Sequence, residues 1–231
     1  MSLTGYWRWR RLNRQRQAGA SRDPALGERL PAPGTPVLGA PMLALDLEMT
    51  GLDPGRDEIV SIGWVPIDDG AIDLAGADEV RLLPGEERGV GDSATIHGIR
   101  DCDRQDGLTP AEALRGMTRA LAGRVAVFHH APLDTGFLDR ALYREFGFGW
   151  LWPTLDTLAW FRNRQLRRGQ DAAAENTALD AARAHYGLEA RSAHNAFDDA
   201  LSCAELALVL AARSRARLVD VCRLPRPGSH R

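Results

Sequence analysis

The sequence predicts an α/β fold in which helices flank a mixed central sheet. Strand-like segments come first, and helix-like and strand-like segments alternate after about residue 109, which is the order expected when helices pack on a sheet. The chain has 231 residues, of which 44% are hydrophobic and 26% are charged. These values are typical of a folded protein and suit one sizeable domain with an appendage.

Composition divides the chain into three parts. Residues 1–41 form a basic N-terminal arm followed by a proline-rich linker, because residues 31–41 hold four prolines and suit neither a helix nor a central strand. Residues 42–213 contain the predicted elements and form the domain. Residues 214–231 are short and carry several arginines and prolines, and we expect them to fray as a C-terminal tail.

Four segments of the domain are predicted strands. Residues 42–48 are apolar with two interspersed acids, and residues 58–67 are rich in β-branched and aromatic side chains. Residues 79–83 are a third, shorter candidate. Residues 125–128 are wholly apolar, as expected for a short buried strand.

Helices are predicted where start and stop residues bracket an amphipathic run. Thr109, Pro110 and Glu112 combine an N-cap, a first-turn proline and a capping-box glutamate, and Gly123 follows the helix that they begin. Further helices are predicted at residues 133–146, 176–186 and 197–213.

Composition also excludes several classes of protein. No apolar run approaches the roughly 18 residues that a membrane-spanning helix needs, and residues 1–16 lack the apolar core of a secretory signal. Cys102, Cys203 and Cys222 are odd in number and lack CxxC spacing, which argues against a disulfide framework or a zinc site. We therefore expect a soluble, cytoplasmic protein.

The formal net charge of −2 hides an asymmetry. Every basic side chain is an arginine, and residues 1–40 carry seven arginines against two acids. That segment has a charge of +5, which leaves −7 for the rest of the chain. A basic arm on an acidic body predicts an anionic partner for the arm and metal cations on the body.

Asp46 and Glu48 lie two residues apart on the first predicted strand. Side chains two apart on a strand point to the same face, so both carboxylates project together, flanked by Leu45 and Leu47, which are expected to be buried. Like charges in an otherwise apolar strand repel one another, and a cation between them explains the pair. An edge strand with solvated acids is the alternative for this segment alone.

Two further acidic patches precede predicted helices. Asp134 stands where a helix begins, so an N-cap is its simplest role when it is taken alone. His194 lies in a loop five residues before Asp199, which belongs to the first turns of the last helix and could oppose the helix dipole together with Asp198. Each patch has a structural explanation alone, but the ordered set does not.

Two carboxylates from a strand and two from helix starts form an all-oxygen ligand set. Such a set suits hard cations such as Mg²⁺ or Mn²⁺. Two such ions about 4 Å apart support an in-line phosphoryl displacement, in which one generates hydroxide and the other stabilises the leaving oxygen. A nearby histidine is the natural base for the proton of the attacking water.

Three motifs in this order resemble the DEDDh family of 3′–5′ exonucleases. They are DLEMTG with Asp46 and Glu48, HHAPLDTGFLD with Asp134, and HNAFDDA with His194 and Asp199. The family includes the proofreading epsilon subunit of bacterial DNA polymerase III, RNase T and oligoribonuclease. The resemblance covers roughly residues 42–212 and implies an RNase H-like fold and two divalent metal ions.

The resemblance also implies roles for individual residues. The implied metal ligands are Asp46, Glu48, Asp134 and Asp199, and the implied general base is His194. The residues implied to approach the terminal nucleotide are Thr50, Gly51, His97 and His129. His130 and Leu133 replace the Asn and Phe of epsilon-type sequences, a change that affects substrate contacts and leaves the metal ligands intact.

The implied reaction releases nucleoside 5′-monophosphates from the 3′ ends of single-stranded DNA, in proofreading or repair. DNA is preferred because the second motif and residues 96–99 are epsilon-like, and RNA is the alternative because DLEMTG is closer to oligoribonuclease. A stand-alone enzyme and one with a polymerase or replication partner both stay open. A non-catalytic nucleic-acid-binding module is less favoured, because the chain retains all five site residues, and a small-nucleotide hydrolase is a third class.

Residues 6–16 leave three interpretations open. Arginine with tryptophan suits single-stranded nucleic acid, an anionic membrane surface or a protein partner equally well. A solvated tail without structure is the alternative. Trp150, Trp152 and Trp160 are expected in the core and the pocket wall, and the arginines of residues 162–168 are expected to be solvated.

Overall fold

The structure is a computed structural model that describes residues 3–85, 93, 95, 98–169, 177–191 and 194–225. Its strands are β1 (Met42–Met49), β2 (Ile59–Asp68), β3 (Ala71–Ile72), β4 (Asp78–Arg81), β5 (Val125–Phe128), β6 (Thr154–Asp156) and β7 (Cys222–Arg223). Within the described ranges they form one seven-stranded sheet in the order β3-β2-β1-β5-β6-β7, and β4 also pairs with β2. β1 is antiparallel to β2 and parallel to β5.

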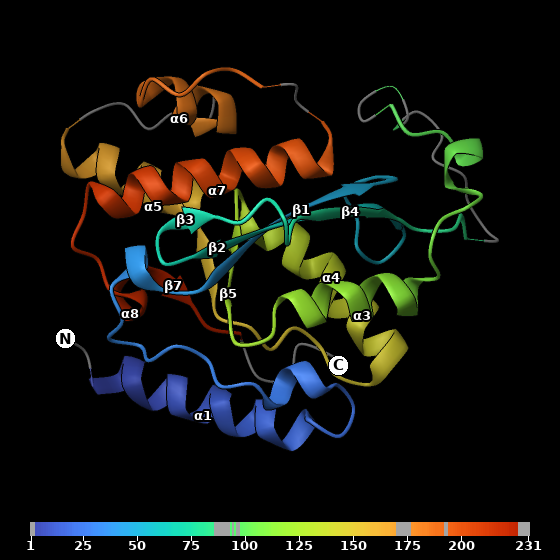
Figure 1. The fold of residues 1–231 in the computed structure, drawn as a ribbon, viewed down its shortest axis with the longest axis horizontal. Helices are drawn as coiled ribbons and strands as arrows, with labels where there is room; N and C mark the ends of the chain where they lie inside the picture. The colour runs from blue at the N-terminus through green and yellow to red at the C-terminus, as the bar shows by residue number, and fades with distance from the viewer. Residues whose placement is uncertain are drawn as a thin grey trace.

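The α-helices are α1 (Leu3–Gly19), α3 (Pro110–Ala120), α4 (Ala131–Phe146), α5 (Thr157–Arg167), α6 (Leu179–His185), α7 (Ala196–Ala212) and α8 (Leu218–Val221). Figure 1 shows the sheet crossing the molecule between α5, α6 and α7 above it and α3 and α4 below it. The predicted mixed sheet flanked by helices is confirmed. Among the described residues, no helix is long and apolar enough to cross a membrane.

β1 presents alternate side chains to two hydrophobic cores. The core shared with α3 and α4 receives Leu43, Leu45 and Leu47. The core shared with α5, α6 and α7 receives Met42 and Ala44. Since side chains alternate along a strand, Asp46 and Glu48 face the α7 side of the sheet.

Local sequence signals account for the start of α3. The Thr109 hydroxyl accepts the Glu112 backbone N–H at 3.3 Å, and the Thr109 N–H donates to Glu112 Oε2 at 3.0 Å. This capping box fixes the first turn, and Leu114 and Met117 then bury one face of the helix. The helix predicted from Thr109 is confirmed.

The start of α4 differs from the prediction. Asp134 is not the N-cap: the helix begins at Ala131, and His130 occupies the cap position with a left-handed φ of 76°. Asp134 is therefore the fourth helical residue, and its side chain is buried. The early start is possible because Pro132 lies in the first turn, where a missing N–H costs no hydrogen bond.

The N-terminal arm is helical and packed, which differs from the solvated-tail alternative. Trp9, Leu12 and Arg16 of α1 are all buried. The proline-rich segment at residues 31–41 is also held against the rest of the protein, because the Val37 N–H donates to the Ala216 carbonyl at 3.0 Å. The boundary at residue 41 stays a prediction, but the segments on either side of it share the same cores.

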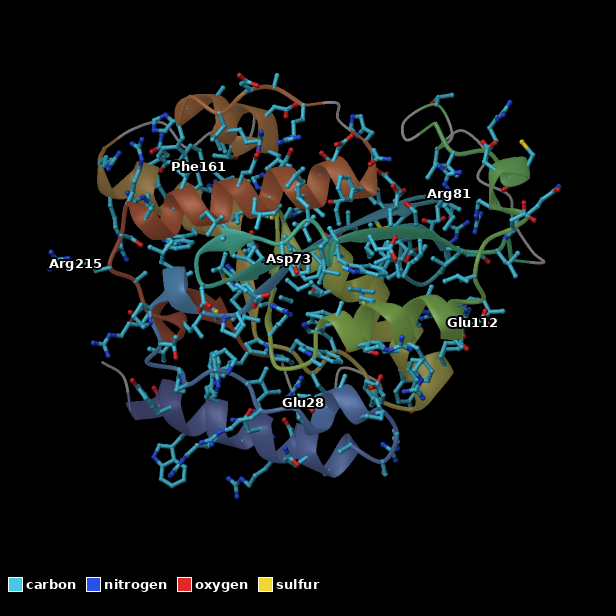
Figure 2. All side chains as sticks on the ribbon, viewed as in Figure 1. Glu28, Asp73, Arg81, Glu112, Phe161 and Arg215 are labelled. Carbon is cyan, nitrogen blue, oxygen red and sulfur yellow. The ribbon has the colours of Figure 1, made fainter. Side chains whose placement is uncertain are left out.

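The C-terminal segment and the region after α4 also contain structure that the sequence did not predict. The expectation of a frayed tail is wrong for residues 214–225: Leu218 of α8 is fully buried, and β7 pairs with β6. β6 has only three residues, and α5 is not among the helices that the sequence predicts. Phe161 of α5, labelled in Figure 2, packs with its ring edge-on to those of His185 and Tyr186 of the α6 segment.

Candidate active site

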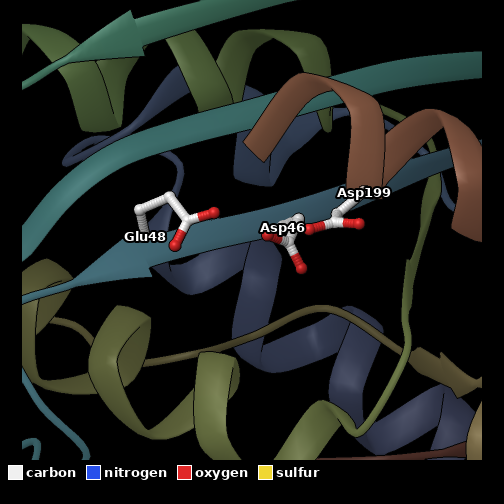
Figure 3. Close-up of side chains that lie close together, drawn as sticks. All are labelled: Asp46, Glu48 and Asp199. Carbon is white, nitrogen blue, oxygen red and sulfur yellow. The ribbon is translucent and has the colours of Figure 1, made fainter. Parts of the chain in front are cut away.

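Three carboxylates meet where β1 passes beneath the first turn of α7. Asp46 and Glu48 project from β1, and Asp199 projects from α7 toward Asp46 (Figure 3). Oxygen atoms of the three side chains all lie within 4.8 Å of one another. The structure thus brings together residues 46, 48 and 199, as the ordered motifs predict.

Gly63 allows α7 to approach the sheet closely enough for this meeting. It lies directly opposite Asp46 in the β1–β2 pair. A Cβ atom at this position would lie 2.5 Å from the Phe197 backbone nitrogen and still closer to the Ala196 carbonyl group. Only glycine leaves room for the backbone of α7 here, and a glycine inside a strand is the sequence signal that could have identified it.

The loop before α7 holds Asp199 through backbone groups. The Asn195 side chain caps the helix by accepting the Asp198 N–H at 3.0 Å. His194 has a left-handed φ of 67°, and its backbone N–H donates to Asp199 Oδ2 at 2.9 Å. The His194 residue itself is exposed to solvent.

Asp134 approaches the same cluster from α4. Its carboxylate accepts a hydrogen bond from the Leu47 backbone, which lies between Asp46 and Glu48 on β1. Burial raises the pKa of Asp134 to about 8, and the charges of Asp156 and Glu48 add to this shift. Asp134 is outside the set of three mutually close carboxylates, but its charge is a leading contributor to the raised pKa of Asp46.

Burial and mutual repulsion make this cluster costly to ionise. Burial is the largest cause of the raised pKa of Asp46, followed by the charges of Asp134 and Asp199. The pKa of Glu48 is raised to about 7, chiefly by burial and then by Asp199, and burial also raises the pKa of Asp199. A divalent cation would relieve this repulsion, and carboxylate oxygens are the ligands that Mg²⁺ and Mn²⁺ prefer.

These shifts predict a distinctive pH dependence of stability. Between about pH 4, the usual pKa of a carboxyl group, and pH 8, the metal-free folded state binds more protons than the unfolded state. Its free energy of unfolding therefore falls as pH rises through this window. We expect Mn²⁺ to raise the melting temperature more at pH 8 than at pH 5.5, as measured by calorimetry with and without EDTA.

The control is a variant with Asp46→Asn and Glu48→Gln, which cannot ionise at these two positions. We expect its melting temperature without metal to depend less on pH than that of the unchanged protein. An equal pH dependence in both proteins would contradict the assignment of the shift to this cluster.

Two of the implied substrate-contact residues, Thr50 and His129, form hydrogen bonds with other residues of the protein. The Thr50 hydroxyl accepts the Glu58 N–H at 2.9 Å, which closes the loop after β1. Both ring nitrogens of His129 are engaged, with the Thr157 hydroxyl at 2.9 Å and the Thr177 carbonyl at 3.0 Å. His129 is thus placed as a support for the interior, and burial lowers its pKa.

The remaining two implied contacts have different outcomes. Gly51 lies against Asp57, because a Cβ atom at position 51 would be 2.5 Å from the Asp57 carboxyl carbon. His97 falls outside the described residues. The substrate-binding roles of Thr50, Gly51, His97 and His129 stay predictions.

Glu79 is a fifth carboxylate that sequence reasoning missed. It lies on β4 opposite Gly63, in line with Asp46 across three strands. Its Oε2 accepts the side-chain N–H of Asn195 at 3.1 Å, and its charge contributes to the raised pKa values of Asp46 and Glu48. The sequence predicts position 79 only as part of a strand, because its partner Asn195 is 116 residues away.

We expect Glu79→Ala to lower kcat/KM by about tenfold or more, because a slight displacement of a catalytic group is costly. The substitution leaves Asn195 without its acceptor and loosens the cap that positions His194 and Asp199. Glu79→Gln keeps an acceptor and should retain most of the activity. Equal kinetics for the two variants would show that the charge matters and the hydrogen bond does not.

A groove of about 940 Å³ lies on the α3 and α4 side of the sheet, and none of the four candidate metal ligands is among its lining residues. It runs between the loop at residues 54–58, the segment at residues 82–85 and the outer face of α4. Phe137 lines it three residues after Asp134, and Arg140 and Arg144 follow along the same helix. The groove therefore combines the apolar side chain of Phe137 with the basic side chains of Arg140 and Arg144.

Comparison with known proteins identifies the family. The family model described as an exonuclease, RNase_T, matches residues 43–207. The chain belongs to the RNase T exonuclease family. The resemblance to DEDDh exonucleases is confirmed, and this family is dependent on divalent metal ions.

Curated relatives of this exonuclease are much longer proteins. It is 32% identical over 170 residues to DNA polymerase III PolC-type of Thermotoga petrophila, a match that covers 73% of this chain and 12% of the relative. It is 33% identical over 190 residues to the DNA polymerase III subunit epsilon-like protein of Rhodobacter capsulatus, with 79% and 25% covered. The exonuclease thus spans a quarter or less of these two relatives.

Solved structures confirm the fold of this exonuclease. Cell-death related nuclease 4 (CRN-4) aligns with a TM-score of 0.63 and 16% identity, over 77% of this chain and 65% of that one. The zinc-bound complex of E. coli ExoI with single-stranded DNA aligns with a TM-score of 0.66 and 18% identity, over 79% and 42%. Both are nucleases that share the mixed sheet and its flanking helices.

Proposed function

We propose that this exonuclease hydrolyses single-stranded DNA from its 3′ end and releases nucleoside 5′-monophosphates. The observation that carries the proposal is the convergence of Asp46, Glu48 and Asp199 beneath an exposed His194. DNA is the proposed polymer because the relatives are named as DNA polymerase III proteins and one structural neighbour binds single-stranded DNA. The thiols of Cys102, Cys203 and Cys222 are free, which supports a reducing, cytoplasmic location.

The donor set fits the divalent metal ions that the family requires. The residues that would hold two Mg²⁺ or Mn²⁺ ions are Asp46, Glu48, Asp134 and Asp199. When bound, such ions supply the Lewis acidity that activates water and neutralises the leaving oxygen. The raised pKa values of the four carboxyl groups support this assignment, because a cluster that repels itself is stabilised by cations.

The residues of the chain then carry the remaining steps. The His194 ring takes the proton of a water whose oxygen attacks the terminal phosphorus. The bond from that phosphorus to the 3′ oxygen of the preceding nucleotide breaks, and that oxygen takes a proton from solvent water. The strand thus keeps a 3′ hydroxyl, and the last nucleotide leaves as a 5′-monophosphate.

The test is degradation of 5′-labelled single-stranded DNA and RNA of matched sequence, with Mg²⁺, Mn²⁺ or EDTA. We expect a metal-dependent ladder that shortens from the 3′ end, with DNA degraded faster than RNA. A faster reaction on RNA would establish the exoribonuclease alternative. Cleavage of neither polymer would overturn the proposal, and an Asp46→Asn preparation controls for contaminating nucleases.

His194→Asn should lower kcat by about 10²-fold, the usual contribution of a general base. Asparagine tolerates the left-handed backbone at this position, and the N–H that holds Asp199 belongs to the backbone, so the fold of the site is preserved. Mn²⁺ affinity measured by calorimetric titration should therefore stay unchanged. A large loss of Mn²⁺ affinity would instead place His194 among the ligands.

A further inference from the structure

Helix α1 is fixed to the body of the protein by one stripe of side chains. Trp9, Leu12 and Arg16, spaced by three and four residues, are buried. The Arg16 guanidinium donates to the carbonyls of Leu151 at 3.1 Å and Ala25 at 3.0 Å, and it lies over the Trp152 ring at 5.0 Å. Burial lowers the pKa of Arg16 to about 10. This arginine therefore packs in the interior and does not belong to the exposed basic surface.

The opposite side of α1 is strongly basic. We define the outer face of α1 by its exposed side chains Trp7, Arg8, Arg10, Arg11 and Arg14. At 100° per residue, residues 7, 10, 11 and 14 point away from the buried stripe, and residue 8 flanks them. The helix contains no acidic residue, and among the residues that the structure describes none of these four arginines forms an ion pair.

We propose that the outer face of α1 is a second nucleic-acid-binding surface, separate from the catalytic carboxylates. Four guanidinium groups on a fixed helix match the phosphates of a strand, and Trp7, which is 65% exposed, offers a ring on which a base can stack. The proposal goes beyond the proposed function, because it assigns binding to a helix that takes no part in hydrolysis. Residues 3–19 also precede the part matched by the exonuclease family model, which begins at residue 43.

The outer face of α1 lies away from the catalytic carboxylates, so it can bind a part of the strand that the active site does not contact. In Figure 1, α1 runs along the lower edge of the molecule, whereas α7, which carries Asp199, crosses its upper half. Nucleic acid on the outer face therefore lies away from the 3′ terminus that is being cleaved. Residues 41–231 have a net charge of −7. This basic face therefore attracts a polyanion electrostatically, although the rest of the molecule is acidic.

A nucleic acid fits the outer face better than a membrane does. An interfacial helix inserts an apolar face between lipid headgroups. In α1, Trp9 and Leu12 already pack against the protein, and Trp7 is the remaining large apolar side chain of the outer face. The exposed side chains of this face are thus cationic and aromatic, and this combination is typical of surfaces that bind single-stranded nucleic acid.

Binding is tested in EDTA, so that no cleavage occurs, with the full chain and a fluorescently labelled 40-nucleotide single-stranded DNA. The test variant replaces Arg8, Arg10, Arg11 and Arg14 with Gln. Each phosphate contact on a single strand contributes about 0.7 to the slope of log affinity against log salt, so the slope should fall by about 3. Between 50 and 200 mM salt, the unchanged protein should accordingly lose about 50-fold more affinity than the variant.

Two further variants control for fold and net charge. Replacing the same four arginines with Lys keeps the charge and should preserve the salt slope, which shows that loss in the Gln variant is not unfolding. Replacing Arg119, Arg162, Arg167 and Arg215 with Gln removes equal charge outside α1; all four are exposed, and Arg215 projects from the left edge of the molecule in Figure 2. An equal loss of slope in this control would overturn the proposal.

Turnover separates this surface from the active site. With metal present, the Gln variant should show a raised KM for the 40-nucleotide strand and unchanged kinetics on a trinucleotide, which is too short to reach both places. Trp7→Ala should weaken binding without changing the salt slope. Unchanged DNA binding with loss of binding to phosphatidylserine vesicles would overturn the proposal in favour of a membrane surface, and these binding results stand even if no nuclease activity is found.

Discussion

Asp46→Asn should lower exonuclease turnover by about 10³-fold and at the same time stabilise the metal-free protein. Asp46 is the central carboxylate of the cluster, because the charges of Asp134, Asp199, Glu48 and Glu79 all contribute to its raised pKa. The substitution replaces a carboxylate ligand with a neutral amide. This change should lower kcat by about 10³-fold, the scale found when a preorganised electrostatic group is removed. The same change removes a buried, repelled charge, so the melting temperature in EDTA at pH 8 should rise.

These opposite effects make the prediction specific. A variant that loses activity because it unfolds would show a lower melting temperature, and a variant at an unimportant surface acid would change neither quantity. Asp198→Asn is the matched control: it lies next to Asp199 in the first turn of α7, where its backbone N–H is bound to the Asn195 cap. We expect Asp198→Asn to keep at least half of the activity, and retention of activity by Asp46→Asn would show that the assignment of the ligands is wrong.

Gly63→Ala should damage both stability and activity, although it adds only one methyl group. The new Cβ would overlap the backbone of α7 at residues 196 and 197, which cannot move without displacing Asp199 from Asp46. Forcing an extra methyl group into a packed interior costs about 1–3 kcal/mol of stability. A displacement of α7 by about 1 Å should lower kcat/KM by about 10²-fold.

Gly116→Ala is the control for this substitution. Gly116 lies within α3, and a Cβ atom there would meet the Trp64 ring at 3.6 Å, an ordinary contact distance. Alanine is favoured over glycine inside a helix by about 1 kcal/mol, so this variant should be as stable as the unchanged protein or slightly more stable. Denaturant unfolding and steady-state kinetics check both variants, and near-normal values for Gly63→Ala would show that α7 can be displaced without cost.

Much of the fold follows from local patterns that the sequence displays directly. The alternation in β1 determines that Asp46 and Glu48 share a face, because strand periodicity does not depend on distant residues. The capping box at Thr109 likewise fixes the start of α3 through atoms only three residues apart. The order of the three motifs was sufficient to predict the exonuclease family, because each motif combines a specific residue type with a fixed spacing.

Other features depend on contacts between distant parts of the chain and have no local signature. The sequence alone determined the sheet-and-helix order, the shared face of Asp46 and Glu48 and the identity of the candidate ligands. Only the tertiary structure decided that Glu79 reaches the site through a hydrogen bond with Asn195 and that Gly63 leaves space for the backbone of α7. It also decided that the buried side chains of Trp9, Leu12 and Arg16 hold the arginine-rich helix α1 against the rest of the protein. The physical reason is that hydrogen bonding, close backbone approach and burial arise between residues far apart in the sequence, such as Gly63 and Ala196, which are 133 positions apart, and no local pattern records them.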